Sequence, residues 1–217
     1  MKFLDRTDAG RQLGIVLRSH GLVDPVVVGL VRGGVPVAAE VARTLDAPLE
    51  ICIVRKLIAP GEPQLTIGAV AEGSAIYVDE ARTQDLGLTV EDLEHAIARE
   101  RSEVARLAEL LRSRPPLDLL GRDVILVDDG AVTGGTIRAA ARAMHGRGAR
   151  SLELAVPVGA SEVIEALRPE FDRILCLIAD RMLVAIGARY STFPPVSETE
   201  VIALLAASRR GSDRAAS

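Results

Sequence analysis

Short apolar runs alternate along the chain with segments whose apolar residues recur at helical spacing. The apolar runs have the length of strands, and several are apolar on both faces, as the central strands of a parallel sheet are. They are VVVGL (26–30), LEICIV (49–54), VILV (124–127), LELAVPV (152–158) and RILCLIA (173–179). The helical patterns cover residues 34–45, 134–147 and 160–168. This alternation predicts an α/β fold with a doubly wound, mainly parallel sheet, whose ligands bind beyond the carboxyl ends of the strands.

Two regions interrupt this alternation. Residues 57–80 begin with glycine and proline and continue as a short hairpin with its turn at 72–74. A mobile flap and a plain surface excursion both fit this pattern. Residues 89–113 carry the longest helical pattern, which opens with the capping pair Thr89 and Asp92. We expect this helix to serve in packing or in a contact between subunits.

No internal repeat or low-complexity linker divides the sequence. We therefore predict a single domain over residues 1–207 and a disordered tail at 208–217, where serine, arginine and small residues dominate. With 217 residues the chain is long enough to bury a substantial core without staples. Cys52 and Cys176 lie inside apolar runs, which indicates buried thiols rather than a disulfide.

The composition limits the partners and the location that can be expected. Apolar residues make up 48% of the chain but aromatic residues only 2%, so the core must be aliphatic. A formal net charge of −4 argues against a broad basic surface for duplex nucleic acid. The first residues contain no apolar signal core, and no run approaches the length of a membrane span. We expect a cytoplasmic protein that binds neither duplex nucleic acid nor membranes and grips any anion locally.

The stretch DVILVDDGAVTGGT at residues 123–136 carries the strongest chemical pattern. A buried strand ends here in two carboxylates, Asp128 and Asp129, although burying charge costs free energy. The glycines and threonines that follow offer backbone amides and hydroxyls at the start of a helix, where anions bind. Because carboxylates repel a phosphate beside them, we expect them to face neutral hydroxyls of the same ligand. A sugar phosphate meets both demands.

This stretch closely resembles the phosphoribosyl pyrophosphate (PRPP) signature of the type I phosphoribosyltransferases. The resemblance implies that Asp128 and Asp129 bind the two ribose hydroxyls. It also implies that the turn after them surrounds the phosphate on the primary carbon of the sugar. The residues of this turn are Gly130, Ala131, Val132, Thr133, Gly134, Gly135 and Thr136.

A second stretch, VGLVRGGVPVAAEVA at residues 28–42, is similar to the loop that contacts pyrophosphate in the same family. In that loop, backbone amides and a basic residue meet the leaving group. Arg32, Gly33 and Gly34 occupy the corresponding positions. The family often has a cis peptide at the position of the Val31–Arg32 bond.

A third stretch, VRKLIAPGEP at residues 54–63, resembles the arginine-lysine step that opens the flexible catalytic loop of adenine-type members. By this resemblance Arg55 and Lys56 direct positive charge at the pyrophosphate. Closure of residues 57–80 would then exclude water from the reaction.

The resemblance also implies a small hood over the acceptor, formed here by residues 178–198. VAIGARYSTF at 184–193 is similar to a late segment of bacterial phosphoribosyltransferases whose acceptor is unassigned. Tyr190 and Phe193 are candidates for stacking on a base, although core packing is the better expectation for each. The 6-oxopurine enzymes have a lysine in the hood, and no lysine follows Lys56 in this chain, which counts against hypoxanthine and guanine.

The activity implied by the resemblance is Mg²⁺-dependent transfer of the phosphoribosyl group from PRPP to an unidentified nitrogenous base, with release of pyrophosphate. Arg55, Lys56 and Asp129 are the candidate catalytic residues, although a purely sugar-binding role for Asp129 fits equally well. Mg²⁺ is expected mainly on the oxygens of the substrate, with indirect contact from Asp128 and Asp129. The family also implies a homodimer. The alternative is a regulatory protein that binds PRPP without turnover, but a sensor needs no cations for a leaving pyrophosphate.

Overall fold

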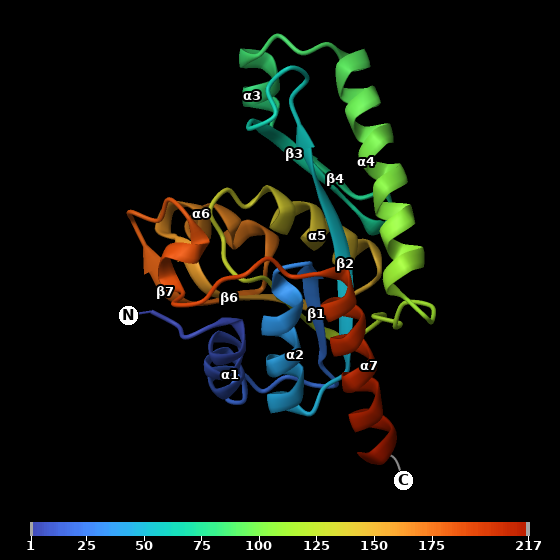
Figure 1. Cartoon of the computed structure of the whole chain (residues 1–217), viewed down its shortest axis with the longest axis vertical. Coiled ribbons are helices and arrows are strands. Elements are labelled where there is room, and N and C mark those ends of the chain that lie inside the picture. The colour runs from blue at the N-terminus through green and yellow to red at the C-terminus, as the bar shows by residue number, and fades with distance from the viewer. Residues whose placement is uncertain (1, 216–217) are drawn as a thin grey trace.

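The computed structural model describes residues 2–215, leaving aside the side chains of residues 209–215. Within this part of the chain, one seven-stranded sheet forms the centre of the molecule. Its strands are β1 (Val26–Val31), β2 (Leu49–Ile58), β3 (Thr66–Ala71), β4 (Ile76–Val78), β5 (Asp123–Val127), β6 (Ser151–Ala160) and β7 (Arg173–Asp180). They lie in the order β4-β3-β2-β1-β5-β6-β7, and the five from β2 to β7 in this order run parallel (Figure 1). The predicted α/β fold with a mainly parallel sheet is confirmed.

Helices cover both faces of this sheet (Figure 1). They are α1 (Arg6–Leu17), α2 (Gly34–Leu45), α3 (Glu80–Asp85), α4 (Val90–Leu111), α5 (Gly135–Gly146), α6 (Ser161–Leu167) and α7 (Glu198–Ala215). Short 3₁₀ turns are η1 (Glu72–Ser74), η2 (Arg168–Glu170) and η3 (Ile186–Arg189). One apolar cluster joins α1, α2, α4 and α7 to the sheet, and another joins α5 and α6 to the opposite face. None of the described helices combines the length and hydropathy that crossing a membrane requires.

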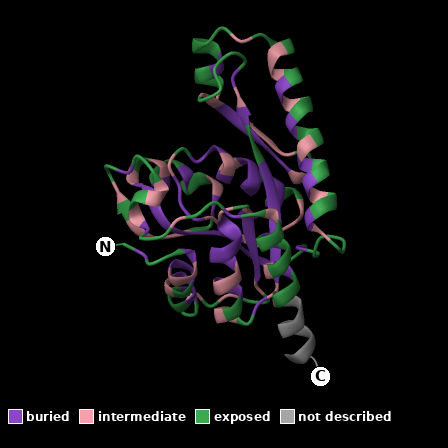
Figure 2. Ribbon diagram, viewed as in Figure 1, coloured by how far each residue is buried: buried purple, intermediate pink, exposed green. Residues whose placement is uncertain are grey.

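The central strands are apolar on both sides because each side faces a helical layer. In β1, Val27 packs with the α2 layer, whereas Val26 and Val28 pack with the α5 layer. In β5, Ile125 and Leu126 divide in the same way. Figure 2 shows the resulting band of buried residues through the strands, with exposed residues on the outer helix surfaces. Of the two cysteines, Cys52 is buried and Cys176 is only partly buried, and both are free thiols.

The helices predicted at 34–45, 134–147 and 160–168 are α2, α5 and α6, with each end correct to within one residue. The long helix predicted at 89–113 is α4. Its capping pair is reciprocal, because the Thr89 hydroxyl accepts a hydrogen bond from the amide of Asp92 and the Asp92 carboxylate accepts one from the amide of Thr89. The local capping chemistry therefore fixes where this helix begins.

Helices α1, α3 and α7 were not predicted. In α1, the buried positions Leu13 and Leu17 are accompanied by Ile15, whose side chain is exposed, so the apolar stripe is blurred. Part of the contact between α1 and α2 is made by glycine: a Cβ added at Gly10 would lie 2.5 Å from the carbonyl oxygen of Val37. A helix that packs through a glycine leaves a weaker periodic signal than one that packs through large side chains.

Strand β2 runs four residues past the predicted end at residue 54 and pairs with β3 in antiparallel register. Together with β4, α3 and α4, this extension forms an arm that stands away from the rest of the sheet (Figure 1). The predicted hairpin is confirmed as β3 and β4 joined by η1. The predicted loop is thereby confined to residues 59–65, and Arg55 and Lys56 lie inside the strand instead of after it. Closure of the 57–80 segment stays a prediction.

The region predicted as a hood, residues 178–198, contains the end of β7, η3 and the segment leading to α7. The N-terminal segment runs beside it: the amide of Phe3 donates to the carbonyl of Arg189 at 2.9 Å, and the amide of Ser191 donates to the carbonyl of Phe3 at 2.8 Å. The predicted disordered tail overlaps the last turns of α7 and extends beyond the described residues, so it stays a prediction.

A buried group of three charges attaches the arm to the body. Arg112, which directly follows α4, contacts Glu50 of β2 at 3.2 Å and also pairs with Glu72 of η1. The side chain of Arg112 is only 8% exposed. Glu50 additionally accepts a hydrogen bond from the amide of Leu117. Each carboxylate thus depends on the same guanidinium for compensation of its charge.

We predict that Arg112→Met lowers the free energy of unfolding by about 3–5 kcal/mol, because two carboxylates are left buried without a cation. The measurement is urea unfolding followed by circular dichroism. Arg106→Met is the matched control, since Arg106 lies on the same helix but forms an exposed pair with Glu103, and a far smaller loss is expected. Equal losses in the two variants would contradict the assignment.

Candidate active site

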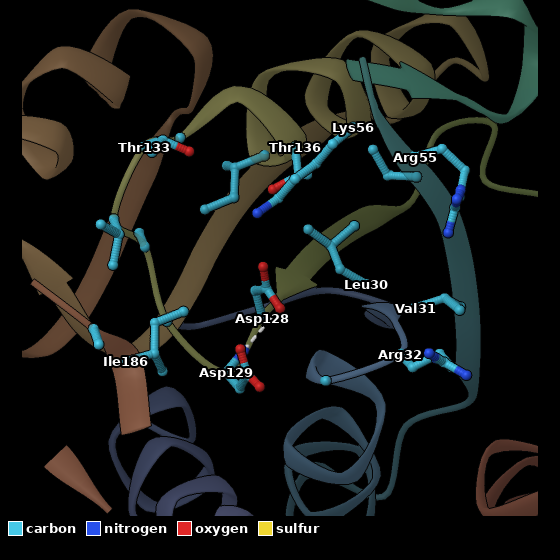
Figure 3. A pocket seen from close by; sticks show the side chains of 18 of the residues that line it. Leu30, Val31, Arg32, Arg55, Lys56, Asp128, Asp129, Thr133, Thr136 and Ile186 are labelled. Atoms are coloured by element: carbon cyan, nitrogen blue, oxygen red, sulfur yellow. Dashed lines mark hydrogen bonds between the residues drawn. The ribbon is translucent and has the colours of Figure 1, made fainter. Parts of the chain in front are cut away.

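A cavity of about 1090 Å³ opens beyond the carboxyl ends of β1, β2 and β5. Helix α2, which follows β1, and helix α5, which follows β5, lie on opposite faces of the sheet. The cavity therefore lies at the switch point of the sheet, where ligands of this fold class bind. Figure 3 shows side chains from these strand ends around one common space.

Most of the predicted site residues line this cavity. From the first two motifs these are Arg32, Gly33, Asp128, Asp129, Gly130, Ala131, Val132, Thr133, Gly134 and Thr136, and the third motif adds Arg55 and Lys56. Phe193 also lines it, whereas Gly34, Gly135 and Tyr190 do not. The three stretches recognised in the sequence thus meet at one crevice. The individual roles of their residues stay predictions.

The turn between β5 and α5 presents backbone groups to the cavity. Its outer side is fixed to β6, because the amide of Ala131 donates to the carbonyl of Val158 at 2.9 Å and the amide of Ala160 donates to the carbonyl of Ala131 at 2.8 Å. Gly134 has a φ of 74°, in the left-handed region that glycine adopts without strain, and α5 begins directly after it. The positive end of α5 and the amides before it form a place for an anion.

The two acidic residues are held close together, with Asp129 buried and Asp128 partly buried. The amide of Asp129 donates to Oδ1 of Asp128 at 2.9 Å, and Asp129 is 7% exposed. Burial raises the pKa of Asp128 well above its usual value, and the negative charge of Asp129 raises it further. Burial also raises the pKa of Asp129, although the charge of Arg6 acts in the opposite direction.

The glycines after β1 are required by close approach to these carboxylates. A Cβ added at Gly33 would lie 2.2 Å from Oδ2 of Asp129, and one added at Gly34 would lie 2.6 Å from the carbonyl oxygen of Val127. No side chain larger than hydrogen fits at such distances. The peptide bond between Val31 and Arg32 is cis, as the family resemblance predicts.

Arg55 and Lys56 project from opposite faces of β2, because successive side chains of a strand alternate. Lys56 lies on the side of Asp128 and Thr136 (Figure 3), and its charge partly opposes the rise that burial causes in the pKa of Asp128. Arg55 points toward α4, where its Nε donates to Glu100 at 3.1 Å. The sequence motif therefore delivers its two cations to different walls of the cavity.

Three carboxylates in the cavity wall were not predicted. Glu100 and Glu103 come from α4 and Glu198 from the start of α7. Glu100 contacts Arg55, and Glu198 lies 4.0 Å from Arg32. These residues lack a local motif; for Glu100 and Glu103 the signal would have been acidic positions beside the apolar stripe of α4.

The most buried unpredicted contact is made by Arg6, the first residue of α1. Its Nε donates to Oδ2 of Asp129 at 2.9 Å, and its Nη2 lies 2.8 Å from the same oxygen. Arg6 itself is 8% exposed. No pattern in the sequence connects these two residues, which are separated by 123 positions.

The hood aromatics have different surroundings. Tyr190 is 3% exposed, and its hydroxyl donates to the carbonyl oxygen of Asp129 at 2.7 Å, so it belongs to the core as the sequence favoured. Burial raises the pKa of this hydroxyl. Phe193 lines the cavity, but the Arg6 guanidinium covers one face of its ring at 3.7 Å from the centroid. The area of Phe193 that remains for a base is correspondingly small.

The comparisons with known proteins agree with this geometry. The model of the family described as "Phosphoribosyl transferase domain" matches residues 9–187. The chain belongs to the phosphoribosyl transferase family. Two "Putative phosphoribosyl transferase" proteins from strains of Mycobacterium tuberculosis are 37% identical over 204 residues, which cover 94% of this chain and 46% of theirs. The chain therefore spans about half the length of these curated relatives.

Solved structures of other proteins share the fold of this chain. The protein TT1426 from Thermus thermophilus is 39% identical, with a TM-score of 0.80 over 94% of this chain and 98% of that protein. A hypothetical protein from Neisseria gonorrhoeae with bound ppGpp shares the fold at 13% identity, with a TM-score of 0.52 over 95% of this chain and 98% of that one. In this member of the phosphoribosyl transferase family, Arg6, Tyr190 and Phe193 lie outside the residues that the domain model matches.

We predict that Asp128→Asn raises the melting temperature of the ligand-free protein at neutral pH. The folded-state pKa of Asp128 is raised, so the folded protein binds more protons than the unfolded chain between the two pKa values, and stability falls as the pH rises through this interval. Asparagine removes the cost of the charge. The gain should therefore be largest at pH 7 and vanish below about pH 4, the unfolded pKa. Thermal unfolding from pH 4 to 8 in the presence of a chelator measures it.

Asp123→Asn, at the other end of β5, is the matched control of opposite sign. Burial acts to raise the pKa of Asp123, but hydrogen bonds from Arg150 and Ser151 outweigh it, and the pKa is lowered. Its contribution to stability is therefore present at neutral pH and lost as the pH falls. Asp123→Asn should destabilise at pH 7. A melting temperature at pH 7 that falls in the Asp128 variant would contradict the prediction.

Proposed function

We propose that this chain transfers the phosphoribosyl group of PRPP to a nitrogenous base and releases pyrophosphate in a Mg²⁺-dependent reaction. The observation that carries the proposal is the meeting of three groups in one cavity: two adjacent carboxylates, an amide-rich turn before a helix, and cations on the neighbouring strand ends. A ribose, its phosphate and a pyrophosphate require these three environments in this order. Because the curated relatives are about twice as long, the proposal concerns the activity of this domain.

The sugar phosphate would bind at the end of β5. Asp128 and Asp129 accept hydrogen bonds from the two ribose hydroxyls, which carry no charge and so suit a carboxylate. Residues Gly130–Thr136 bind the phosphate on the primary carbon with backbone amides, threonine hydroxyls and the positive end of α5. The phosphate is thereby kept on the far side of the turn from the carboxylates, where repulsion is weaker.

The pyrophosphate would lie between the ends of β1 and β2. Arg32, with the backbone of Gly33 and Gly34, contacts it from one side, and Lys56 contacts it from the other. As the bond to the anomeric carbon breaks, negative charge grows on the leaving group, and these cations stabilise it. Arg55 can contact the pyrophosphate only if it first leaves its ion pair with Glu100. Orientation of the sugar by the turn supplies the remaining contribution.

The residues fit a Mg²⁺ ion held through the substrate. Among the described residues, no group of three or more metal-ligating side chains occurs, and Oδ2 of Asp129 is bound to Arg6. The protein side of a magnesium site would thus be limited to indirect contact from Asp128 and Asp129. When bound with PRPP, Mg²⁺ neutralises charge on the leaving pyrophosphate.

The acceptor would lie on the hood side of the cavity, next to Asp129. The lining there consists of Val184, Ala185, Ile186, Gly187 and the edge of Phe193, which suits a flat base recognised through backbone groups. Asp129 is then the candidate proton acceptor from the base, or serves the ribose alone. Homodimer formation and a cytoplasmic location remain expectations from the family.

We expect isothermal titration to detect binding of PRPP in the presence of Mg²⁺, and the double variant Asp128→Asn/Asp129→Asn to weaken it by about 100-fold or more, since two charge-assisted hydrogen bonds are lost. Asp118→Asn, an exposed carboxylate remote from the cavity, is the control and should bind as the wild type does. Absence of binding by the wild type would refute the proposal. Binding without pyrophosphate release in a screen of bases would favour the non-catalytic alternative.

A second measurement separates the two cations of β2. We predict that Lys56→Gln weakens binding of Mg²⁺-pyrophosphate by about tenfold, whereas Arg55→Gln has a smaller effect, because Arg55 is compensated by Glu100. Calorimetry with pyrophosphate provides the comparison. A larger effect of Arg55→Gln would show that the guanidinium leaves Glu100 to bind the ligand and would reverse the assignment.

A further inference from the structure

Arg6 is a buried cation that does not line the cavity. Its guanidinium is enclosed by three partners from distant parts of the chain: the carboxylate of Asp129, the carbonyl of Pro194 at 2.7 Å from Nη1, and the ring of Phe193. The side chains of Arg6 and Asp129 are each 10% exposed. The other arginine of α1, Arg11, does not share this environment; its side chain is 58% exposed and pairs with Glu40.

Two constraints act on Asp129 around this contact. Both nitrogens of Arg6 that meet the carboxylate use Oδ2, which is also the oxygen that lies against Gly33. The backbone of Asp129 is held separately, since its carbonyl oxygen accepts the hydrogen bond from Tyr190. One oxygen of the carboxylate is thereby committed to the protein, and Oδ1 is the oxygen that Arg6 leaves for a ligand hydroxyl.

We infer that Arg6 is a positioning residue: it fixes the carboxylate of Asp129 for the ribose and ties the acceptor-side segment at Phe193 and Pro194 to that carboxylate. The inference rests on the proposed function for the identity of the ligand. Arg6 acts only through residues that line the cavity, because it does not line the cavity itself. A buried guanidinium without such a task would cost more than an apolar side chain of similar size.

Arg6 can position Asp129 and the hood together because three separate segments of the chain meet at its side chain. Arg6 begins α1, Asp129 follows β5, and Phe193 with Pro194 belongs to the hood segment. Arg6, Phe193 and Pro194 lie outside the residues 9–187 that match the domain family. The segments before and after the matched region therefore meet at Asp129, directly after the end of β5. The positive charge of Arg6 holds the carboxylate of Asp129, whereas the planar guanidinium adds the contacts with the carbonyl of Pro194 and the ring face of Phe193.

The test is a double-mutant cycle on PRPP affinity, measured by calorimetry with Mg²⁺ on the full chain. Arg6→Gln should weaken binding by about tenfold, and Arg6→Lys, which keeps the charge, should recover most of that loss. Arg11→Gln, on the same helix, should stay within about twofold of the wild type. In the Asp129→Asn background, Arg6→Gln should change affinity by less than about twofold, because its route of action is already removed.

Two outcomes overturn the inference. If Arg6→Gln weakens Asp129→Asn as much as it weakens the wild type, Arg6 does not act through Asp129. If Arg6→Gln leaves the affinity unchanged, it positions nothing for the ligand. A merely structural role would also fail to give recovery by lysine, which cannot reproduce the contacts with Phe193 and Pro194.

The same variants separate failure of this inference from failure of the proposed function. If the wild type binds no PRPP, the proposed function is wrong, and the cycle is read from urea unfolding of the ligand-free proteins. Non-additive losses of stability for Arg6→Gln and Asp129→Asn then support the hold of Arg6 on Asp129. Additive losses overturn it.

Discussion

Two adjacent carboxylates at the end of a buried strand impose the constraint around which the site is built. Asp128 and Asp129 repel each other, and Asp129 has little access to water, so each neighbour must either approach without bulk or bring a compensating charge. The glycines after β1 answer the first requirement, since a Cβ at Gly33 would meet Asp129 at 2.2 Å. Arg6 answers the second. Such an unfavourable arrangement of like charges is common in binding sites and rare in cores.

The sequence predicted well those elements whose formation depends on residues close together in the chain. Runs of apolar residues gave the parallel strands, helical spacing gave α2, α5 and α6, and the pair of Thr89 and Asp92 gave the start of α4. Helix α1 and the end of β2 were missed because they depend on distant partners. Helix α1 packs partly through glycine against α2, and β2 extends beyond residue 54 because β3 returns to pair with it. Neither reason is visible in a window of a few residues.

The site divides in the same way. Its three motifs were found because each is a continuous stretch at the end of a strand, and the topology brings such ends together. The compensating groups were not found, since Glu100 and Glu198 reach the cavity, and Arg6 reaches Asp129, from helices that carry no ligand-binding motif. The opposite directions of Arg55 and Lys56 follow from simple strand alternation and would have been predictable had β2 been extended by two residues. Because the strand was predicted to end at residue 54, Arg55 and Lys56 were both expected to point at the same ligand.

The arm, which the end of β2 forms with β3, β4, α3 and α4, becomes ordered when the protein folds and not when a ligand binds. A chain segment that became ordered only around a ligand would lose backbone entropy worth about 1–2 kcal/mol per residue with every binding event. Here a ladder of strand pairs already orders much of residues 57–80 as part of the fold. That entropy is lost once, when the protein folds. The wall that carries Lys56 is consequently ordered before a ligand binds, and the ligand retains more of its contact energy as affinity.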